Sequence, residues 1–301
     1  MLRIKLLSLL AAVMCCLLNI ASPISAATPS PQPSSGGCTI TSGMYVSFRH
    51  NNVLRSFKVF VPPNASRGTA MVVSLHGATG TGAGQEAGTG FSKLGAKEGF
   101  IALYPQSSGV GANAVWKVNT NSPDVDFVGS LVKFFHTSGC SSPAKTFVNG
   151  FSMGAMLTSR LMCDRGPLFG GAAMVGGVFP PTCKVSPTKP IVVIHGLHDV
   201  VVLYDGTMRA PVVAATGPWA VFSITRAAMA AQWSGAKGCA RRLAVVSTPT
   251  LARTVWKCPS GAPTTMLTYL NGGHTWNSPG YKLLASHYIW LSMRSVIPPL
   301  T

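Results

Sequence analysis

The sequence predicts an α/β protein built on a mostly parallel, doubly wound sheet that begins with an antiparallel hairpin. Continuous apolar runs of strand length alternate with helix-like segments along the chain, as in parallel strands that are buried on both faces. Polar motifs follow several of these runs directly, which is where doubly wound sheets bind their ligands. With 301 residues and only 10% of them charged, the chain is neither a disordered protein nor a coiled coil.

The expected elements can be placed in order. Residues 44–50 and 53–61 are β-like runs separated by Asn51-Asn52, a pair that favours a hairpin turn. Asp124 is an N-cap residue type before a stretch with one apolar face, so it is expected to open a helix. The other expected strands are 70–75, 100–104, 145–149, 172–175, 191–195 and 264–270, and the other expected helices are 86–98, a segment after Ser152, 219–233 and 280–294.

The N-terminus reads as a secretory signal peptide over residues 1–27. Arg3 and Lys5 precede an uncharged apolar run at 6–20, and small residues near Ala26 offer a cleavage site. An uncleaved anchor is the alternative, but the run is short for a bilayer span. Residues 28–37 then form a Pro/Ser/Gly tether, and 38–301 are expected to be one catalytic domain of a secreted protein with no stable membrane span.

The formal net charge is +17, from 24 Lys and Arg against 7 Asp and Glu. Three explanations are open: a solvated surface, attraction to acidic cell-wall polymers, or nucleic-acid binding. The basic residues are scattered and only Arg241 and Arg242 are adjacent, which argues against nucleic acid as a partner. We expect a general surface effect with weak adhesion to anionic polymers.

Six cysteines remain once Cys15 and Cys16 leave with the signal peptide. An even number in an exported chain indicates disulfides, with 15 arrangements open. None of the six forms a C-x-x-C pair, so no metal site is expected. Proximity along the chain favours the pairs Cys163–Cys183 and Cys239–Cys258, which leaves Cys38 for Cys140.

Gly150-Phe151-Ser152-Met153-Gly154 is a G-x-S-x-G motif between a predicted strand and a predicted helix. This context is that of a nucleophile elbow, in which the glycines allow a sharp turn that projects the serine hydroxyl above the sheet. A glycine-flanked turn serine is the alternative. Because a free hydroxyl is a poor nucleophile, Ser152 needs a base and a group that orients the base.

In proteins with this elbow the acid follows the serine along the chain, and the histidine follows the acid. Four carboxylates precede Ser152, and Asp164 falls within the helix after it. Asp199 lies just beyond the apolar strand 191–195, whereas Asp205 is further out in the same loop. Asp199 is therefore the predicted acid.

His274 is the predicted base because it follows strand 264–270 in a glycine-flanked loop. His287 falls within the last predicted helix, and His195 and His198 precede Asp199, against the expected order. A structural role in the loop is the alternative for His274.

An oxyanion hole completes the site. One donor should be the backbone N–H of Met153, and the other should come from the loop after the early strand, at Ala78 or within one residue of it. His76 in this loop is expected to shape it rather than to take part in chemistry.

These motifs resemble secreted esterases of the poly(3-hydroxybutyrate) depolymerase family, which is related to the feruloyl and acetylxylan esterases of carbohydrate esterase family one. The resemblance extends over most of residues 45–280 through GFSMGAMLTSRLMC, LHGATG, ALYPQ, PDVDFVGSLV, IHGLHDVVVLYDG and NGGHTWN. It implies an α/β-hydrolase fold, ester hydrolysis without a cofactor, and a triad of Ser152, Asp199 and His274. Ala155, Asp126 and Asn277 depart from the family pattern outside the triad.

The resemblance implies a serine esterase acting on a polyester or an acylated polysaccharide. Trp116 and Trp276 are candidate substrate platforms, with buried packing as the alternative. Two other functions stay open: a peptidase or acyltransferase with the same triad, and a binding protein without catalysis. Asn64 begins a glycosylation sequon that matters only in a eukaryotic host.

Overall fold

The computed structural model describes residues 38–109, 111–207, 225–239, 242–258, 261–277 and 284–294. The expected signal peptide (1–27) and tether (28–37) therefore lie outside the described residues, as do parts of the predicted helices 219–233 and 280–294. Among the described residues, no helix is both long and apolar enough to pass through a bilayer.

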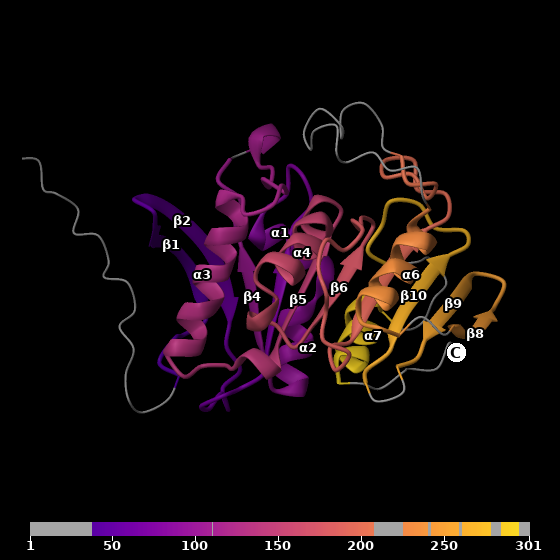
Figure 1. The fold of residues 1–301 in the computed structure, drawn as a ribbon. Coiled ribbons are helices and arrows are strands. Elements are labelled where there is room, and N and C mark those ends of the chain that lie inside the picture. Colours follow the sequence, from indigo (N-terminus) through magenta and orange to yellow (C-terminus); the bar gives the residue numbers. More distant parts are fainter. Residues whose placement is uncertain are drawn as a thin grey trace, which may run out of the picture.

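Ten strands form one sheet that runs across the described part of the chain (Figure 1). Its order is β1-β2-β4-β3-β5-β6-β7-β10-β9-β8. The six strands from β4 to β10 in this order are parallel to their neighbours, whereas the strands at both ends pair antiparallel. The strands are β1 (Gly43–His50), β2 (Val53–Phe60), β3 (Met71–Leu75), β4 (Ile101–Pro105), β5 (Thr146–Phe151), β6 (Gly171–Val175), β7 (Ile191–Gly196), β8 (Arg242–Ser247), β9 (Leu251–Trp256) and β10 (Thr264–Tyr269).

Helices cover both faces of the sheet, as the doubly wound prediction requires. In Figure 1, α3, α4 and α6 lie in front of the strands and α7 lies behind them. Helix α1 packs against β3 and β4, whereas α2 packs against β4 and also contacts α7. The helices are α1 (Gly82–Thr89), α2 (Phe91–Glu98), α3 (Pro123–Thr137), α4 (Met153–Asp164), α6 (Arg226–Ala236) and α7 (Ala285–Met293).

Each face of the sheet has its own apolar core, because successive side chains of a strand point to opposite sides. In β3, Val73 packs into the core beneath α3, α4 and α6, while Val72 packs into the core beneath α2 and α7. The central strands are buried along their whole length. This double burial explains why their sequences are continuously apolar.

Two helix predictions need correction. The segment expected as one helix at 86–98 is two helices, because Gly90 adopts a left-handed conformation (φ 68°) that ends α1 and precedes α2. Asp124 is not the N-cap of α3: Ser122 is, with its hydroxyl accepting from the Val125 N–H. Asp124 instead forms a buried ion pair with Arg55, at 2.6 Å.

The strands β8 and β9 were not predicted. They extend the sheet beyond β10 as an antiparallel pair, with β9 paired to β10 from Thr264↔Trp256 to Tyr269↔Leu251. The sheet is therefore mostly parallel with antiparallel strands at both ends, rather than at its N-terminal end alone.

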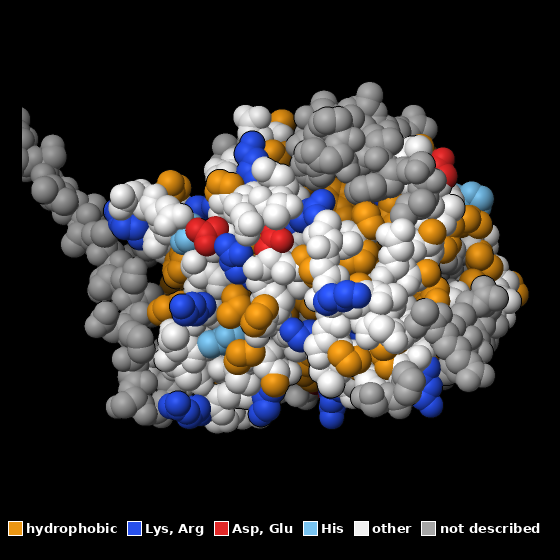
Figure 2. Space-filling view, viewed as in Figure 1, with side chains coloured by type: hydrophobic (Ala, Val, Ile, Leu, Met, Phe, Trp, Pro, Cys, Tyr) orange, Lys and Arg blue, Asp and Glu red, His pale blue; other side chains and the backbone are white. Residues whose placement is uncertain are grey.

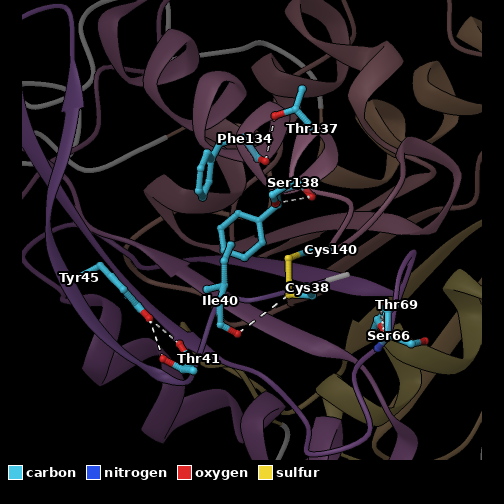
Figure 3. The surroundings of a disulfide bond; sticks show 11 residues. Cys38, Ile40, Thr41, Tyr45, Ser66, Thr69, Phe134, Thr137, Ser138 and Cys140 are labelled. Atoms are coloured by element: carbon cyan, nitrogen blue, oxygen red, sulfur yellow. Dashed lines mark hydrogen bonds between the residues drawn. A yellow bond between two sulfur atoms is a disulfide. The ribbon is translucent and has the colours of Figure 1, made fainter. Parts of the chain in front are cut away.

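The six cysteines of the described chain form three disulfides. These are Cys38–Cys140, Cys163–Cys183 and Cys239–Cys258. Cys38–Cys140 joins the start of the described chain to the residues just after α3, close to Ile40 and Ser138 (Figure 3). It connects segments 102 residues apart, whereas the other two bridges connect segments 20 and 19 residues apart.

Candidate active site

Ser152 sits on the sharp turn between β5 and α4. Its backbone is at φ 54° and ψ −119°, a strained conformation for a residue with a side chain. The turn requires glycine on both sides of the serine. A Cβ on Gly150 would lie 2.2 Å from the Gly154 carbonyl carbon, and a Cβ on Gly154 would lie 2.3 Å from the Leu75 oxygen. The Ser152 N–H donates to the Val175 oxygen of β6, which anchors the turn to the neighbouring strand.

Asp199 follows β7 and is hydrogen-bonded to His274. Its Oδ2 lies 2.7 Å from Nδ1 of His274, so this nitrogen donates to the carboxylate. Its Oδ1 accepts the backbone N–H groups of Val201 and Val202, each at 2.9 Å. Burial alone would raise the pKa of Asp199, but hydrogen bonds from His195 and His274 hold it well below its usual value. The carboxylate is therefore ionised wherever the histidine could act as a base.

The loops that carry Asp199 and His274 are fixed to each other. Strands β7 and β10 are parallel neighbours, and they end together at Gly196 and Tyr269. Beyond that point the Leu197 N–H donates to the Tyr269 oxygen, and the His198 N–H donates to the Gly272 oxygen. The acid and the histidine are thus held on adjoining strand ends, while Ser152 comes from β5.

Ser152 and His274 line the same cavity, which has a volume of about 390 Å³. Ala78 and Met153, the expected oxyanion donors, line it too. Met153 is the first residue of α4, where backbone N–H groups have no partner within the helix. The remaining wall is formed by Gly77, Thr79, Ala112, Val115, Phe151 and Val201.

His76 holds the loop that carries Ala78. Its Nδ1 donates to the Gly77 oxygen at 2.7 Å, and its Nε2 accepts the Ser107 N–H at 3.2 Å. Trp116 stacks near the imidazole and donates its indole N–H to the His76 oxygen. Burial lowers the pKa of His76, against the opposing effects of the Gly77 hydrogen bond and of Asp124. A neutral imidazole at this position fits the loop-shaping role expected from the sequence.

The structure places the two candidate tryptophan platforms inside the protein. Trp116 is 1% exposed and Trp276 is 8% exposed. The Trp276 indole donates to the Ser286 hydroxyl of α7 and packs edge-on against Phe91. These contacts describe packing, the alternative that the sequence left open.

Four cavity residues were not expected from the sequence: Ala112, Val115, Phe151 and Val201. Phe151 could have been found, because it is the variable residue before the elbow serine, and its ring lies 4.8 Å from that of His274. Ala112 and Val115 carried no signal, since they belong to an irregular segment after β4 that only the fold brings to the serine.

Two of the rejected residues, Asp205 and His287, do not line the cavity. Asp205 is exposed, and its carboxylate accepts from the backbone and hydroxyl of Thr207. His287 lies on α7, which packs on the other face of the sheet from α4. Within the described ranges, no three His, Cys, Asp or Glu side chains come together as a metal site would require.

Known proteins resemble this chain in sequence over part of its length. Acetylxylan esterase A of Talaromyces purpureogenus is 30% identical over 127 residues, which are 40% of this chain and 33% of that protein. NocK of Nocardia uniformis subsp. tsuyamanensis, described as an esterase, is 27% identical over 242 residues, or 74% of this chain and 70% of that protein. The chain spans between 33% and 47% of the length of the acetylxylan esterases that it matches. No protein-family profile matches the chain.

The fold itself has a solved counterpart. The structure of the acetyl xylan esterase from Aspergillus awamori superposes with a TM-score of 0.59 at 19% identity, covering 78% of this chain and 94% of that one. The chain therefore has an α/β-hydrolase fold, as the resemblance of its motifs implied.

Proposed function

We propose that this α/β-hydrolase is a serine carboxylic-ester hydrolase with Ser152 as nucleophile, His274 as base and Asp199 as the orienting acid. One observation carries the proposal. His274, hydrogen-bonded to Asp199, lines the same cavity as a serine held in a strained elbow. A buried carboxylate that fixes the tautomer of a histidine beside such a serine is what acyl transfer requires.

The reaction would proceed in two steps. Nε2 of His274 takes the Ser152 proton as the hydroxyl attacks the ester carbonyl, and Asp199 stabilises the imidazolium through Nδ1. The backbone N–H groups of Met153 and Ala78 bind the oxyanion. The leaving alcohol then takes the proton from His274, and water releases the acyl group from the serine by the same route.

The cavity supports a neutral acyl group as substrate. Among the described residues, the lining apart from Ser152, Thr79 and His274 consists of glycine and apolar side chains, with no carboxylate, lysine or arginine. A charged acyl chain would lose its hydration there without gaining a partner. The relatives support an acylated polysaccharide such as acetylated xylan as the natural ester, with a hydroxyalkanoate polyester as the second candidate.

Secretion is part of the proposal. Three disulfides persist in oxidising compartments and are rare in the cytosol, so they support an exported protein. Figure 2 shows Lys and Arg side chains dispersed over the molecular face with few acidic ones between them. This dispersion fits weak adhesion to anionic polymers. The protein should therefore elute from a polyanion column at about 0.15 M salt, where the Debye length is about 8 Å.

A hydrolysis panel tests the activity. Acetylated xylan, methyl ferulate, hydroxybutyrate oligomers, short p-nitrophenyl esters and a peptide amide should be offered to the wild type and to Ser152→Ala. We expect ester hydrolysis with at most trace amidase activity, and a fall in kcat of about 10⁴-fold or more in the variant. A fluorophosphonate should label the wild type at one site per chain and leave Ser152→Ala unlabelled. Hydrolysis that survives in Ser152→Ala, or an unlabelled wild type, would contradict the proposal.

A further inference from the structure

Asp199 has a second imidazole beside it. His195, at the end of β7, places Nε2 3.3 Å from Oδ2 of Asp199, the same oxygen that accepts from His274. Chain order argued against His195 as the base because it precedes the acid. Its side chain is completely buried, so the contact is made without water.

The hydrogen-bond partners of His195 determine its tautomer. Nε2 lies 2.8 Å from the Val202 oxygen, and a carbonyl oxygen can only accept, so Nε2 carries the proton. Oδ2 of Asp199, at 3.3 Å, is a second and longer contact of the same nitrogen. Nδ1 is buried and has no hydrogen-bond partner in the described part of the chain. Protonating Nδ1 would bury an unpaired N–H, so the imidazole is neutral.

On balance the surroundings of His195 lower its pKa and favour the neutral imidazole. Burial lowers its pKa, the hydrogen bond and charge of Asp199 oppose this, and the positive charge of Arg226 on α6 lowers it further. Arg226 donates to the Val178, Leu203 and Thr207 oxygens around the same loop. Tyr204 packs edge-on against the imidazole, and on β10 the residue paired with His195 is Thr268.

We propose that His195 is a positioning residue for the reaction. Its single N–H, shared between Val202 and Asp199, holds the acid loop closed and withdraws part of the negative charge of Oδ2. The inference rests on the proposed function, since it concerns how Asp199 supports His274. A carboxylate that shares its charge with His195 stabilises the His274 imidazolium less than an unshared one. His195 would thus lower the pH at which the enzyme gains activity.

Two conservative variants separate this role from simple packing. In His195→Gln the amide nitrogen can replace Nε2, whereas in His195→Asn it replaces Nδ1 and the bond to Asp199 is lost. We expect His195→Asn to lower kcat for p-nitrophenyl acetate about tenfold, equivalent to about 1.4 kcal/mol, with KM unchanged. The acidic limb of its kcat/KM profile should move to higher pH by about half a unit. His195→Gln should stay within about threefold of the wild type, with the wild-type profile.

His136→Asn is the matched control. His136 is a partly buried histidine whose pKa is lowered by burial, but its Nε2 bonds the Thr146 hydroxyl at the amino-terminal end of β5. The variant should therefore leave the profile unchanged. If His195→Asn keeps the wild-type profile, or if Gln and Asn behave alike, the inference is wrong.

A measurement on the wild type keeps the inference testable if the variants do not fold. Nitrogen-15 NMR of labelled histidines should show His195 as the neutral Nε2–H tautomer from pH 5 to 9. An imidazolium or an Nδ1–H tautomer in that range would overturn the inference. Failure of the proposed function is a separate result. A wild type that hydrolyses no ester would contradict the proposed function, whereas the NMR spectrum tests only the tautomer of His195.

Discussion

Lys237, at the C-terminal end of α6, has a buried amino group, for which the described residues provide one hydrogen-bond acceptor. Its Nζ donates to the Ala262 oxygen at 2.6 Å, and the residue is only 4% exposed. Burial lowers its pKa from 10.5 to about 8. Between these two values the unfolded chain binds more protons than the folded one, so stability should rise with pH over that window. Below about pH 8 the folded protein carries a buried charge.

Lys237→Met should stabilise the protein at neutral pH. Removing the buried charge is expected to raise the free energy of unfolding at pH 7 by about 1–2 kcal/mol, part of the gain being offset by the lost bond to Ala262. The variant should also lose the rise in stability between about pH 8 and 10.5. Urea unfolding at several pH values measures both effects. Lys145→Met is the control, because that exposed lysine also donates to a carbonyl, Gly68. Equal behaviour of the two variants would argue against this account.

At the scale of single residues, chain order and strand context were sufficient to choose Ser152, Asp199 and His274, and the structure brings these three choices to one region. The same reasoning failed for Asp124. Its residue type favours an N-cap, but its carboxylate accepts a buried hydrogen bond from Arg55, which lies 69 residues earlier in the chain. A local preference cannot reveal a partner that only the tertiary fold supplies.

The nucleophile elbow is the element on which the site depends. Helix α4 approaches β3 so closely that a Cβ on Gly154 would lie 2.3 Å from the Leu75 oxygen and 2.6 Å from the His76 oxygen. Both are backbone atoms, which cannot turn aside as a flexible side chain can. A methyl group there must therefore push α4 away from the strand that leads into the Ala78 loop.

Gly154→Ala should consequently destabilise the protein by about 3 kcal/mol and remove most of its activity. Gly88→Ala in α1 makes a matched comparison, since a Cβ at that position meets no atom within 4 Å. It should be neutral or stabilise by up to about 1 kcal/mol through helix propensity. Urea unfolding with p-nitrophenyl acetate hydrolysis measures both. A Gly154→Ala protein as stable as Gly88→Ala would show that the close approach has been misjudged.

Among the elements, the central parallel strands were predicted well because burial on both faces makes them continuously apolar. Strand β8 has an apolar run at 243–246 that could have indicated it, whereas β9 was missed for the opposite reason. At this end of the sheet β9 is buried only at some positions, with Ala252, Arg253 and Thr254 half-buried, so it has no continuous apolar run. The break at Gly90 was missed because two short helices separated by one glycine look like a single helix with an internal glycine.

At the scale of the molecule, the disulfides differ in the length of chain that they close. In the chain-entropy account a bridge stabilises by restricting the unfolded chain, with about 3 kcal/mol for a 15-residue loop and about 4.7 kcal/mol for 100 residues. Cys38–Cys140 spans 102 residues and Cys239–Cys258 spans 19. The first bridge should therefore contribute more to stability.

Replacing Cys38 and Cys140 together by serine is expected to cost about 1–2 kcal/mol more than the same replacement of Cys239 and Cys258. Urea unfolding of the two double variants, with the remaining bridges intact, gives the comparison. The reverse order would indicate that local packing around the bridges outweighs the loop they close.

The two walls of the cavity are formed by loops from different strands of the sheet. Ser152, His274 and the Asp199 loop come from β5, β7 and β10, while Ala78, Thr79, Ala112 and Val115 come from the loops after β3 and β4. Residues 112 and 115 can thus be enlarged or trimmed without moving the groups that transfer the proton. The same scaffold could then be tuned toward shorter or bulkier acyl chains by redesigning one side of the pocket alone.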